Sequence, residues 1–276
     1  MNYHSECLIK MPAPFAVFRP FATVGNPVRL IMLLAVIACA PSLAWGASLQ
    51  WGNIAGGTFS TPGNWKSGIA PTAADAVYFQ TPKHAYSVNF SADAATDGLY
   101  VNGDQVTLNL QGHTYKVTTA YRDAIEVYNY NIDNYVTKLR VTGGVIDTAG
   151  VNVGGSANTL SVMEVVGPAT KITQYDQYGE VTVGDEGAGE LLIDDRAEVY
   201  ANSFGVWIGG NPGTGDNAHG LVTISNGGKL ISAGTNYLGQ HGGSADLKIL
   251  SGGSFQSTYS FVGGHHGGVN NVLAAC

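Results

Sequence analysis

Few residues of this 276-residue chain carry a charge. Asp, Glu, Lys and Arg together make up 12% of the sequence, about half of the share that is usual in a soluble domain. The 20 acidic residues outnumber the 13 basic residues, and the formal net charge is −7. Binding to nucleic acid requires clustered Lys and Arg side chains that face the phosphates. The composition therefore argues against a nucleic-acid partner.

Cysteine is also scarce. Of the three cysteines, Cys7 and Cys39 lie near the N-terminus, and the chain after residue 44 contains only Cys276, its last residue. A lone thiol cannot form an internal disulfide. We therefore expect the fold to be stabilised by the stacking of structural units.

Long apolar runs are missing except for one, over residues 30–40. This run is shorter than the roughly 20 residues that a spanning helix needs. Arg19 and Arg29 precede it and small residues follow it, as in a signal peptide. We expect residues 1–44 to be an export signal that is cleaved after Ala44 or Gly46.

The same run offers a second processing site. Residues 36–39, with the sequence Val-Ile-Ala-Cys, look like a bacterial lipobox, in which the cysteine is acylated. On this alternative Cys39 carries a lipid anchor. Membrane association is expected only through the signal peptide or this anchor.

Glycine, in contrast, is abundant: 38 of the 276 residues are glycine, about twice the usual share. Five steps of an apolar residue followed by glycine recur at intervals of 24 to 30 residues. They are Val153-Gly154, Val183-Gly184, Ile208-Gly209, Leu238-Gly239 and Val262-Gly263. A period of this size is typical of stacked units that bury their apolar faces only against one another.

Short turns recur in register with these steps, each after a strand of alternating polarity. They are Gly143-Gly144, Gly167-Pro168, Asp194-Asp195, Gly227-Gly228 and Gly252-Gly253. Gly, Asn and Asp tolerate the positive φ that such turns need. Alternation at period two places one side chain inward and the next outward.

These units predict an all-β fold, a right-handed parallel β-helix (solenoid). A sandwich or an up-and-down barrel is the alternative. The units resemble one another, however, and lack the two-residue hairpin turns that antiparallel pairs prefer. Coils about 4.8 Å apart would give about seven coils over residues 95–276 and a rod of about 30–35 Å. Residues 211–217 form the clearest loop on its side.

Three segments are expected along the chain. They are the signal peptide (1–44), an N-terminal cap (45–98) and the β-helix repeats (99–276). Trp51, Trp65 and Phe79 are expected to cap the apolar end of the rod. A sugar-stacking platform of Trp51 and Trp65 is the alternative. Residues 269–276 stop within what should be another coil, which indicates a truncated chain or a partner made of further solenoid repeats.

The cap segment has a recognisable pattern. Trp51, Asn64-Trp65, Pro71 and the run Asp-Ala-Val-Tyr-Phe at 75–79 precede the glycine-rich repeats. This pattern resembles the opening of exported bacterial β-solenoid proteins of the autotransporter-passenger and sorting-signal surface-protein type. The resemblance implies an extracellular or outer cell-surface location, with the periplasm as the alternative. It implies an architecture rather than one activity.

The strongest acidic cluster pairs Asp185-Glu186 with Asp194-Asp195-Arg196, one strand away. Carboxylates of this kind could hold Ca²⁺ or act as acid and base in a polysaccharide lyase or hydrolase. Turn geometry already accounts for Asp194-Asp195, because these residues align with the Gly-Gly turns. We therefore expect no catalytic site. The alternative is an enzyme that uses Asp185, Asp194, Asp195 and Arg196.

Histidines give a weaker pattern. His241 and His265-His266 follow the apolar-Gly steps at matching positions and could form a metal-binding pair. No carboxylate or cysteine stands beside them at ligand spacing, so exposed loop histidines are the expectation. We expect no cofactor. The alternative is a weak Ca²⁺ or metal site drawn from Asp185, Glu186, His241, His265 and His266.

Tyrosines gather in one segment, at Tyr121, Tyr128, Tyr130 and Tyr135. We expect them to ladder along the rod, with a carbohydrate or protein contact surface as the alternative. The sequence as a whole predicts an exported surface module, structural or adhesive, without catalysis. Its expected partners are glycans or cell-surface proteins, bound weakly at many points. A bare spacer without a ligand is a third possibility.

Overall fold

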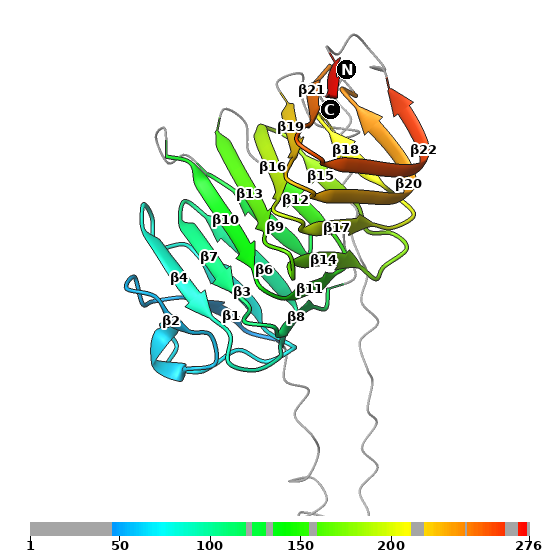
Figure 1. The fold of residues 1–276 in the computed structure, drawn as a ribbon. Helices are drawn as coiled ribbons and strands as arrows, with labels where there is room; N and C mark the ends of the chain where they lie inside the picture. Colours follow the sequence, from blue (N-terminus) through cyan, green and yellow to red (C-terminus); the bar gives the residue numbers. More distant parts are fainter. Residues whose placement is uncertain are drawn as a thin grey trace, which may run out of the picture. The chain divides into compact units, whose positions relative to one another are not determined.

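The structure is a computed structural model that describes residues 46–119, 123–130, 135–154, 159–210, 218–240, 242–262 and 270–274. These residues form a parallel β-helix, as predicted, in which successive coils stack along one axis (Figure 1). The one helical element in them is a 3-10 turn, η1 (Pro62–Asn64). Within this part of the chain no helix has the length and apolar character needed to cross a membrane.

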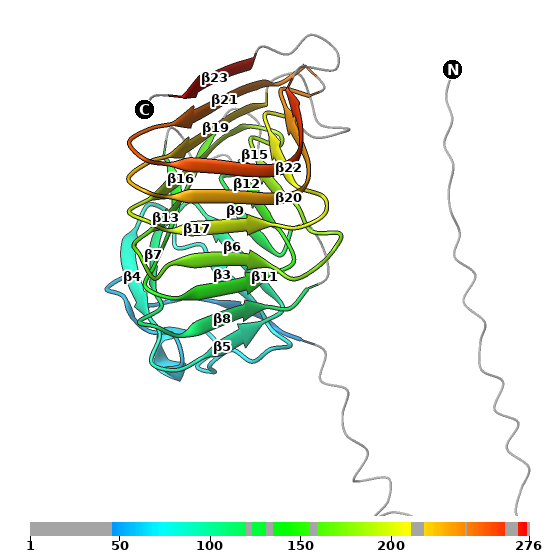
Figure 2. The same ribbon diagram turned by 45° about the vertical axis from the view of Figure 1, so that its right-hand side comes forward.

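Each coil contributes strands to three faces, which Figure 2 shows from the side. The first face is a nine-stranded sheet: β2 (Gly57–Thr58), β4 (Ala85–Asn89), β7 (Gln105–Asn109), β10 (Thr137–Thr142), β13 (Leu160–Val166), β16 (Ala188–Asp194), β19 (His219–Ile224), β21 (Ser244–Ile249) and β23 (Asn270–Ala274). The other sheet has 14 strands and forms the remaining two faces.

The second face comprises β5 (Ala94–Thr96), β8 (Thr114–Val117), β11 (Val145–Thr148), β14 (Lys171–Gln174) and β17 (Glu198–Ala201). The third face comprises β1 (Ser48–Gln50), β3 (Ala76–Phe79), β6 (Gly98–Asn102), β9 (Ile125–Tyr128), β12 (Val151–Val153), β15 (Val181–Val183) and β18 (Val206–Ile208). The long strands β20 (Lys229–Leu238) and β22 (Ser254–Val262) pass from the second face to the third and join them.

The apolar residues of the repeat stack directly on one another. Val153 pairs with Val183, Val183 with Ile208, Ile208 with Leu238, and Leu238 with Val262. The first four side chains are buried in the core. Parallel strands are stable only when both neighbours present the same side-chain direction, so a one-residue slip would turn this whole ladder outward. The apolar-Gly repeat of the sequence thus marks the residues that pair with one another from coil to coil on the third face.

Two of the described steps show why glycine is required there. Gly184 and Gly209 have φ values of 76° and 70°, a conformation that residues with a Cβ rarely adopt. A Cβ on Gly184 would overlap the backbone of His219, and one on Gly209 would overlap the carbonyl oxygen of Ser244. Glycine therefore lets the chain leave the third face while the next coil passes close by.

The cap residues lie inside the first coils. Trp51, Trp65 and Phe79 are all buried, and the two indole rings meet edge to face at a centroid distance of 5.1 Å. Each indole N–H donates to a backbone carbonyl, that of Asn53 or Phe59, at 2.7 Å. Buried rings cannot stack on a sugar, so the alternative of a platform made by Trp51 and Trp65 is wrong.

Parallel pairing begins within the segment that the sequence assigned to the cap. β1 pairs with β3, β3 with β6, and β4 with β7, all in parallel. Residues 76–98 therefore belong to the same two sheets as the repeats that follow. The aromatic cluster fills the interior of these first coils, where later coils use Val, Leu and Ile.

One fully buried carboxylate holds the connection before β4. Asp104 accepts hydrogen bonds from the Thr81 amide and hydroxyl, at 2.7 and 2.8 Å, and from the Tyr86 hydroxyl at 2.7 Å. Its other oxygen faces the His84 amide at 3.4 Å. A buried charge is tolerated when hydrogen bonds replace its hydration. Asp104 is therefore structural.

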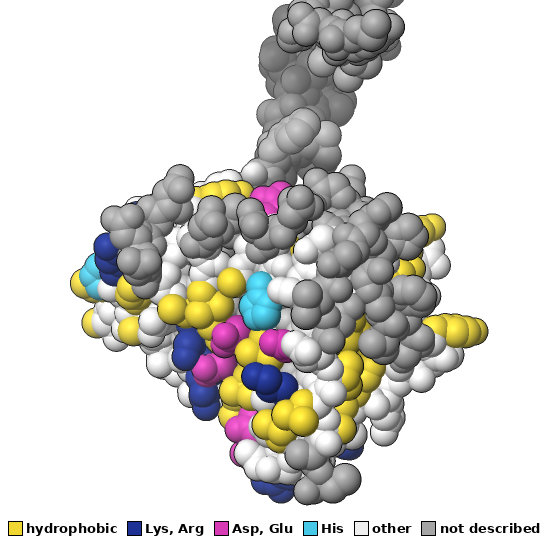
Figure 3. Space-filling model, turned by 90° about the horizontal axis from the view of Figure 1, so that it is seen from above, with side chains coloured by type: hydrophobic (Ala, Val, Ile, Leu, Met, Phe, Trp, Pro, Cys, Tyr) yellow, Lys and Arg dark blue, Asp and Glu magenta, His cyan; other side chains and the backbone are white. Residues whose placement is uncertain are grey.

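Charged side chains on the outside of the sheets pair across the coils. Glu164 binds both Lys138 and Arg140 at 2.7 Å on the first face. Glu198 binds Lys171 at 2.8 Å and Lys229 at 2.9 Å on the second face. Figure 3 shows acidic and basic side chains interspersed among hydrophobic ones on the face that it displays. These basic groups already have carboxylate partners, so they do not form a free cationic surface.

The role of the step glycines can be tested by Gly209→Ala. The new Cβ would be forced against Ser244 in a strained backbone conformation, so we expect the free energy of unfolding to fall by about 2 kcal/mol or more. Gly63→Ala is the matched control, because a Cβ at that position would have no other atom within 4 Å. Urea denaturation followed by circular dichroism measures both. Equal effects of the two substitutions would contradict the close-approach argument.

Candidate functional site

The outward-facing residues of the third face form a continuous column. Each lies between two inward buried residues, so alternation turns its side chain away from the core. In pairing order the column is Tyr78, Tyr100, Glu126, Asn152, Thr182, Trp207 and Tyr237. Aromatic residues therefore stand at both ends of the column, and hydrogen-bonding groups stand in the middle.

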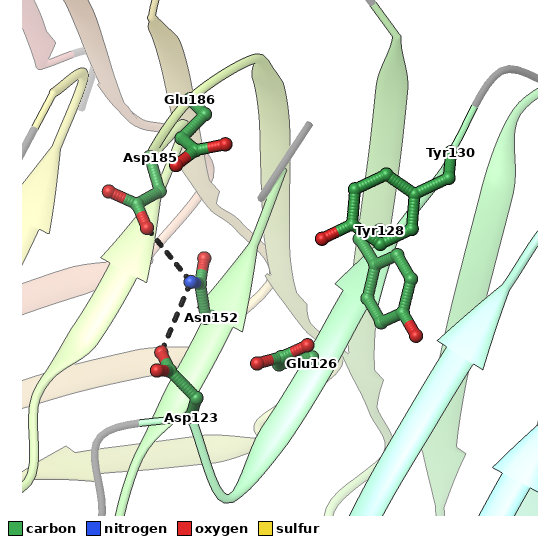
Figure 4. Close-up of a pocket in the computed structure, with 7 residues that line it drawn as sticks. All are labelled: Asp123, Glu126, Tyr128, Tyr130, Asn152, Asp185 and Glu186. Carbon is green, nitrogen blue, oxygen red and sulfur yellow. Dashed lines mark hydrogen bonds between the residues drawn. The ribbon is translucent and has the colours of Figure 1, made fainter. Parts of the chain in front are cut away.

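The middle of the column opens into an acidic hollow with a volume of about 160 Å³. Four carboxylates, an amide and two phenol rings line it. The lining residues are Asp123, Glu126, Tyr128, Tyr130, Asn152, Asp185 and Glu186 (Figure 4). They come from β9, from β12 and from the residues flanking β9 and β15. The stacking of three coils thus brings together residues that are far apart in the sequence.

Asn152 lies at the centre of the acidic hollow. Its Nδ2 donates to Asp185 Oδ2 at 3.0 Å and to Asp123 Oδ1 at 3.3 Å, as the dashed lines in Figure 4 show. Asn152 is 8% exposed and Asp185 is 5% exposed. The amide of Asn152 thus ties together carboxylates from the coils on either side of it.

Glu126 is paired in register with Asn152 on the neighbouring strand. Burial raises the pKa of Glu126 to about 7, and the nearby carboxylates of Asp123 and Asp185 contribute in the same direction. Desolvation and like charges both disfavour the ionised form of a carboxyl group. Glu126 therefore changes its charge near neutral pH.

Two tyrosines form one side of the hollow. The rings of Tyr128 and Tyr130 meet at a centroid distance of 4.7 Å with an interplanar angle of 60°. Tyr128 is buried, whereas Tyr130 is 60% exposed. Tyr135 lies elsewhere and points its hydroxyl toward the carbonyl of His84, and Tyr121 lies outside the described residues.

The expected tyrosine ladder occurs between two other residues. Tyr78 and Tyr100 stack on adjacent strands at 4.7 Å with an interplanar angle of 12°. Tyr128 and Tyr130 instead line the hollow, with Tyr130 exposed at its edge. Tyr128 and Tyr130 therefore do not form the predicted ladder, and the contact surface that was its alternative stays a prediction.

A second hollow, of about 190 Å³, lies farther along the third face and is lined by Ser203, Phe204, Trp207, Thr235 and Tyr237. The rings of Trp207 and Tyr237 are 4.2 Å apart, and the Trp207 indole N–H donates to the Phe204 carbonyl at 3.3 Å. We call it the aromatic hollow. Trp207 follows Asn152 by two coils, which corresponds to about 10 Å along the axis.

The acidic residues singled out in the sequence do not form one site. Asp185 and Glu186 line the acidic hollow. Asp194 lies at the opposite end of β16, about 20 Å away at the usual rise of a strand. It accepts hydrogen bonds from Ser225 Oγ and Asn226 Nδ2, both at 2.7 Å, and so links one turn to the next.

Asp195 and Arg196 are the turn residues, one position later than the predicted Asp194-Asp195 turn, because Asp194 still belongs to β16. Their φ values are 48° and 65°, and the equivalent Asn226 and Gly227 of the next coil have 48° and 78°. Their own ion pair, at 3.4 Å, is largely exposed. An enzyme built from Asp185, Asp194, Asp195 and Arg196 together is therefore not supported by the geometry.

The histidine candidates His241, His265 and His266 lie outside the described residues, as do Cys39 and the loop 211–217. Within the described part of the chain, no three His, Cys, Asp or Glu residues are grouped so as to hold a metal ion. The Ca²⁺ alternative for Asp185 and Glu186 stays a prediction.

Sequence reasoning missed Asp123, Glu126 and Asn152 as site residues. A usable pattern was present, because the residue that precedes each apolar-Gly step faces outward. This position contains Asn152, Thr182, Trp207 and Tyr237 in successive coils. Glu126 stands at the same position in a coil without the glycine, where Tyr128 follows Val127.

Comparison with other proteins adds no precedent for this site. No protein-family model, no curated protein and no solved structure matches the chain. The fold is therefore assigned from its strand pairing, and the site from its contacts.

The protonation of Glu126 can be tested by Glu126→Gln. The folded-state pKa of about 7 lies above the ordinary value of 4.5, so the folded state holds the proton more tightly than the unfolded state. Stability from this group is present below pH 4.5 and is lost as pH rises through 7. From pH 5 to pH 8 we expect the free energy of unfolding of the wild type to fall by about 1–2 kcal/mol more than that of Glu126→Gln. This figure allows for the partial exposure of Glu126.

Urea denaturation at a series of pH values measures this difference. Glu190→Gln, on the first face, is the control for the loss of a carboxylate elsewhere on the coil. A constant difference between wild type and Glu126→Gln across the range would show that Glu126 titrates as an ordinary glutamate.

The turn role of Arg196 predicts a stabilising substitution. Arg196→Gly removes the cost of a side chain at positive φ, and we expect the free energy of unfolding to rise by up to about 1 kcal/mol. Gly227→Ala at the equivalent position of the next coil should lower it by about 1 kcal/mol. Thermal unfolding of the two variants and of the wild type measures both changes in stability. A loss of stability in Arg196→Gly would contradict the turn interpretation.

Proposed function

We propose that this protein is an exported bacterial surface module that binds a glycan along its third face, without catalysis. The observation that carries the proposal is the column of outward residues, which links the acidic hollow to the aromatic hollow. A straight, regularly spaced row of ligand-binding groups suits a linear polymer, because many weak contacts add up along its length.

The chemistry of the two hollows fits a sugar chain. Trp207, Tyr237 and Phe204 supply apolar ring surface, and Ser203 and Thr235 supply hydroxyl groups beside it. Glu126 and Asn152 supply hydrogen-bond acceptors. Sugars combine apolar C–H faces with many hydroxyl donors, so they can use both kinds of surface. Sites of this kind combine apolar rings with a few placed polar groups.

The location is proposed from the sequence. The run at 30–40 with its flanking arginines supports export, either by cleavage near Ala44 or by lipidation at Cys39. The parallel β-helix and the tryptophan-containing opening support kinship with autotransporter passengers and other bacterial surface solenoids. The excess of acidic over basic residues is suited to a module that stays in solution outside the cell.

The aromatic hollow is tested by Trp207→Ala. We expect affinity for the glycan that a microbial and host glycan array identifies to fall by about tenfold or more, because alanine removes most of the ring surface. Tyr200→Ala is the matched control, since Tyr200 is an exposed aromatic residue on the second face. If both variants bind as the wild type does, the third face is not the glycan surface.

A glycan-cleaving enzyme is the second candidate, and the pKa of Glu126 near 7 favours it. A carboxyl group that is protonated at neutral pH can donate a proton to a leaving oxygen, with Asp185 or Asp123 as the second carboxylate. Incubation of the wild type with each bound glycan, followed by mass spectrometry, distinguishes the two functions. Shortened products that disappear in Glu126→Gln would establish the enzyme, and intact glycans would support the binding module.

A further inference from the structure

Hydrogen bonding fixes the direction of the Asn152 amide. Its Nδ2 donates to Asp123 and to Asp185, so the reversed amide would place its oxygen against two carboxylates. Asn152 Oδ1 is consequently held away from both aspartates, within the acidic hollow (Figure 4). This oxygen is buried and has no hydrogen-bond partner. A buried acceptor without a partner is costly and points to a ligand that donates to it.

Glu126 provides a second acceptor in the same hollow, on the strand next to that of Asn152. The two residues are directly paired on adjacent strands, which places their backbones about 4.8 Å apart. Figure 4 shows Glu126 between Asn152 and the two tyrosines. The residues described around the hollow include no Lys or Arg. Apart from the two tyrosine hydroxyls, the groups that line the hollow and remain open to a ligand are acceptors, and Glu126 among them carries a full negative charge when it is ionised.

An ammonium group complements this arrangement. It has three N–H donors and no acceptor, so it can bind Asn152 Oδ1 and the Glu126 carboxylate together. Tyr130, which lines the hollow and is exposed at its rim, is an aromatic ring within reach of the same cation. The charge on the ligand would also relieve the repulsion among the carboxylates that line the hollow.

The aromatic hollow indicates which kind of molecule bears the ammonium group. It lies two coils away on the same face, or about 10 Å along the axis, and its rings and hydroxyl groups suit a sugar. We propose that the acidic hollow binds the free amino group of an amino sugar, in a polysaccharide that also contacts Trp207. This inference rests on the proposed glycan-binding function and specifies its ligand.

The test compares three oligosaccharides of equal length against the full chain by isothermal titration calorimetry. They are oligomers of β-1,4-linked glucosamine, of N-acetylglucosamine and of glucose. We expect the glucosamine oligomer to bind at least about tenfold more tightly than the other two, as befits a charge-assisted hydrogen bond. In Glu126→Gln this preference should disappear, while in Glu190→Gln it should remain.

The outcomes separate the inference from the proposed function. Equal binding of the glucosamine and N-acetylglucosamine oligomers would overturn the amino-group assignment and leave glycan binding intact. Binding of none of the oligomers here or on the glycan array would overturn both. If an oligolysine peptide binds as tightly as the glucosamine oligomer, the assignment of the ligand as a sugar would be overturned in favour of a basic polypeptide. Displacement of the glucosamine oligomer by millimolar Ca²⁺, with the displacement lost in Glu126→Gln, would assign the hollow to a metal ion.

If Glu126→Gln does not fold, as judged by circular dichroism, Tyr130→Ala replaces it. Tyr130 is largely exposed, so its loss should leave the coil intact while removing the ring beside the ammonium. We expect the preference for the glucosamine oligomer to fall about threefold to tenfold in this variant. An unchanged preference in a folded Tyr130→Ala would overturn the proposed placement of the amino group.

Discussion

In-register stacking of parallel strands is the constraint on which the rest of this structure depends. Every strand of the third face pairs with the equivalent strand of the next coil, residue on residue. Apolar side chains such as Val153, Val183 and Ile208 therefore meet one another from coil to coil. The burial gained in this way is repeated along the axis, and no disulfide is needed to hold the described coils together.

The same stacking organises the surface. An outward residue in one coil lies directly over the outward residue of the coil before it. Side chains of different chemical types therefore become neighbours because they occupy equivalent positions in successive coils. Glu126 and Asn152 meet in this way, and so do Trp207 and Tyr237. Two carboxylates on neighbouring coils share one amide, and the amide oxygen is left facing the hollow. The site is thus a product of the register rather than of a loop built for the purpose.

Much of the fold could be predicted because its physical cause is local and repeats. The apolar-Gly steps, the turn next to Asp194 and the alternating strands each follow from backbone geometry that a few neighbouring residues impose. The burial of Trp51, Trp65 and Phe79 was also expected from their size and position. The continuity of the sheets into residues 76–98 was not, because that segment lacks the glycine spacing that marked the later coils.

The candidate site was only half predictable. Asp185 and Glu186 were noticed as an acidic pair, yet they were grouped with Asp194 because the two pairs are close in the sequence. β16 is extended, and it carries Asp194 to the far end of a face, whereas Asp123 and Asn152 arrive beside Asp185 from earlier coils. The sequence alone determined the period, the turns and the inward residues of this protein, since those depend on local geometry. Only the tertiary structure decided which outward residues share a hollow, because that depends on the offset between coils and on the burial that the stacked coils create.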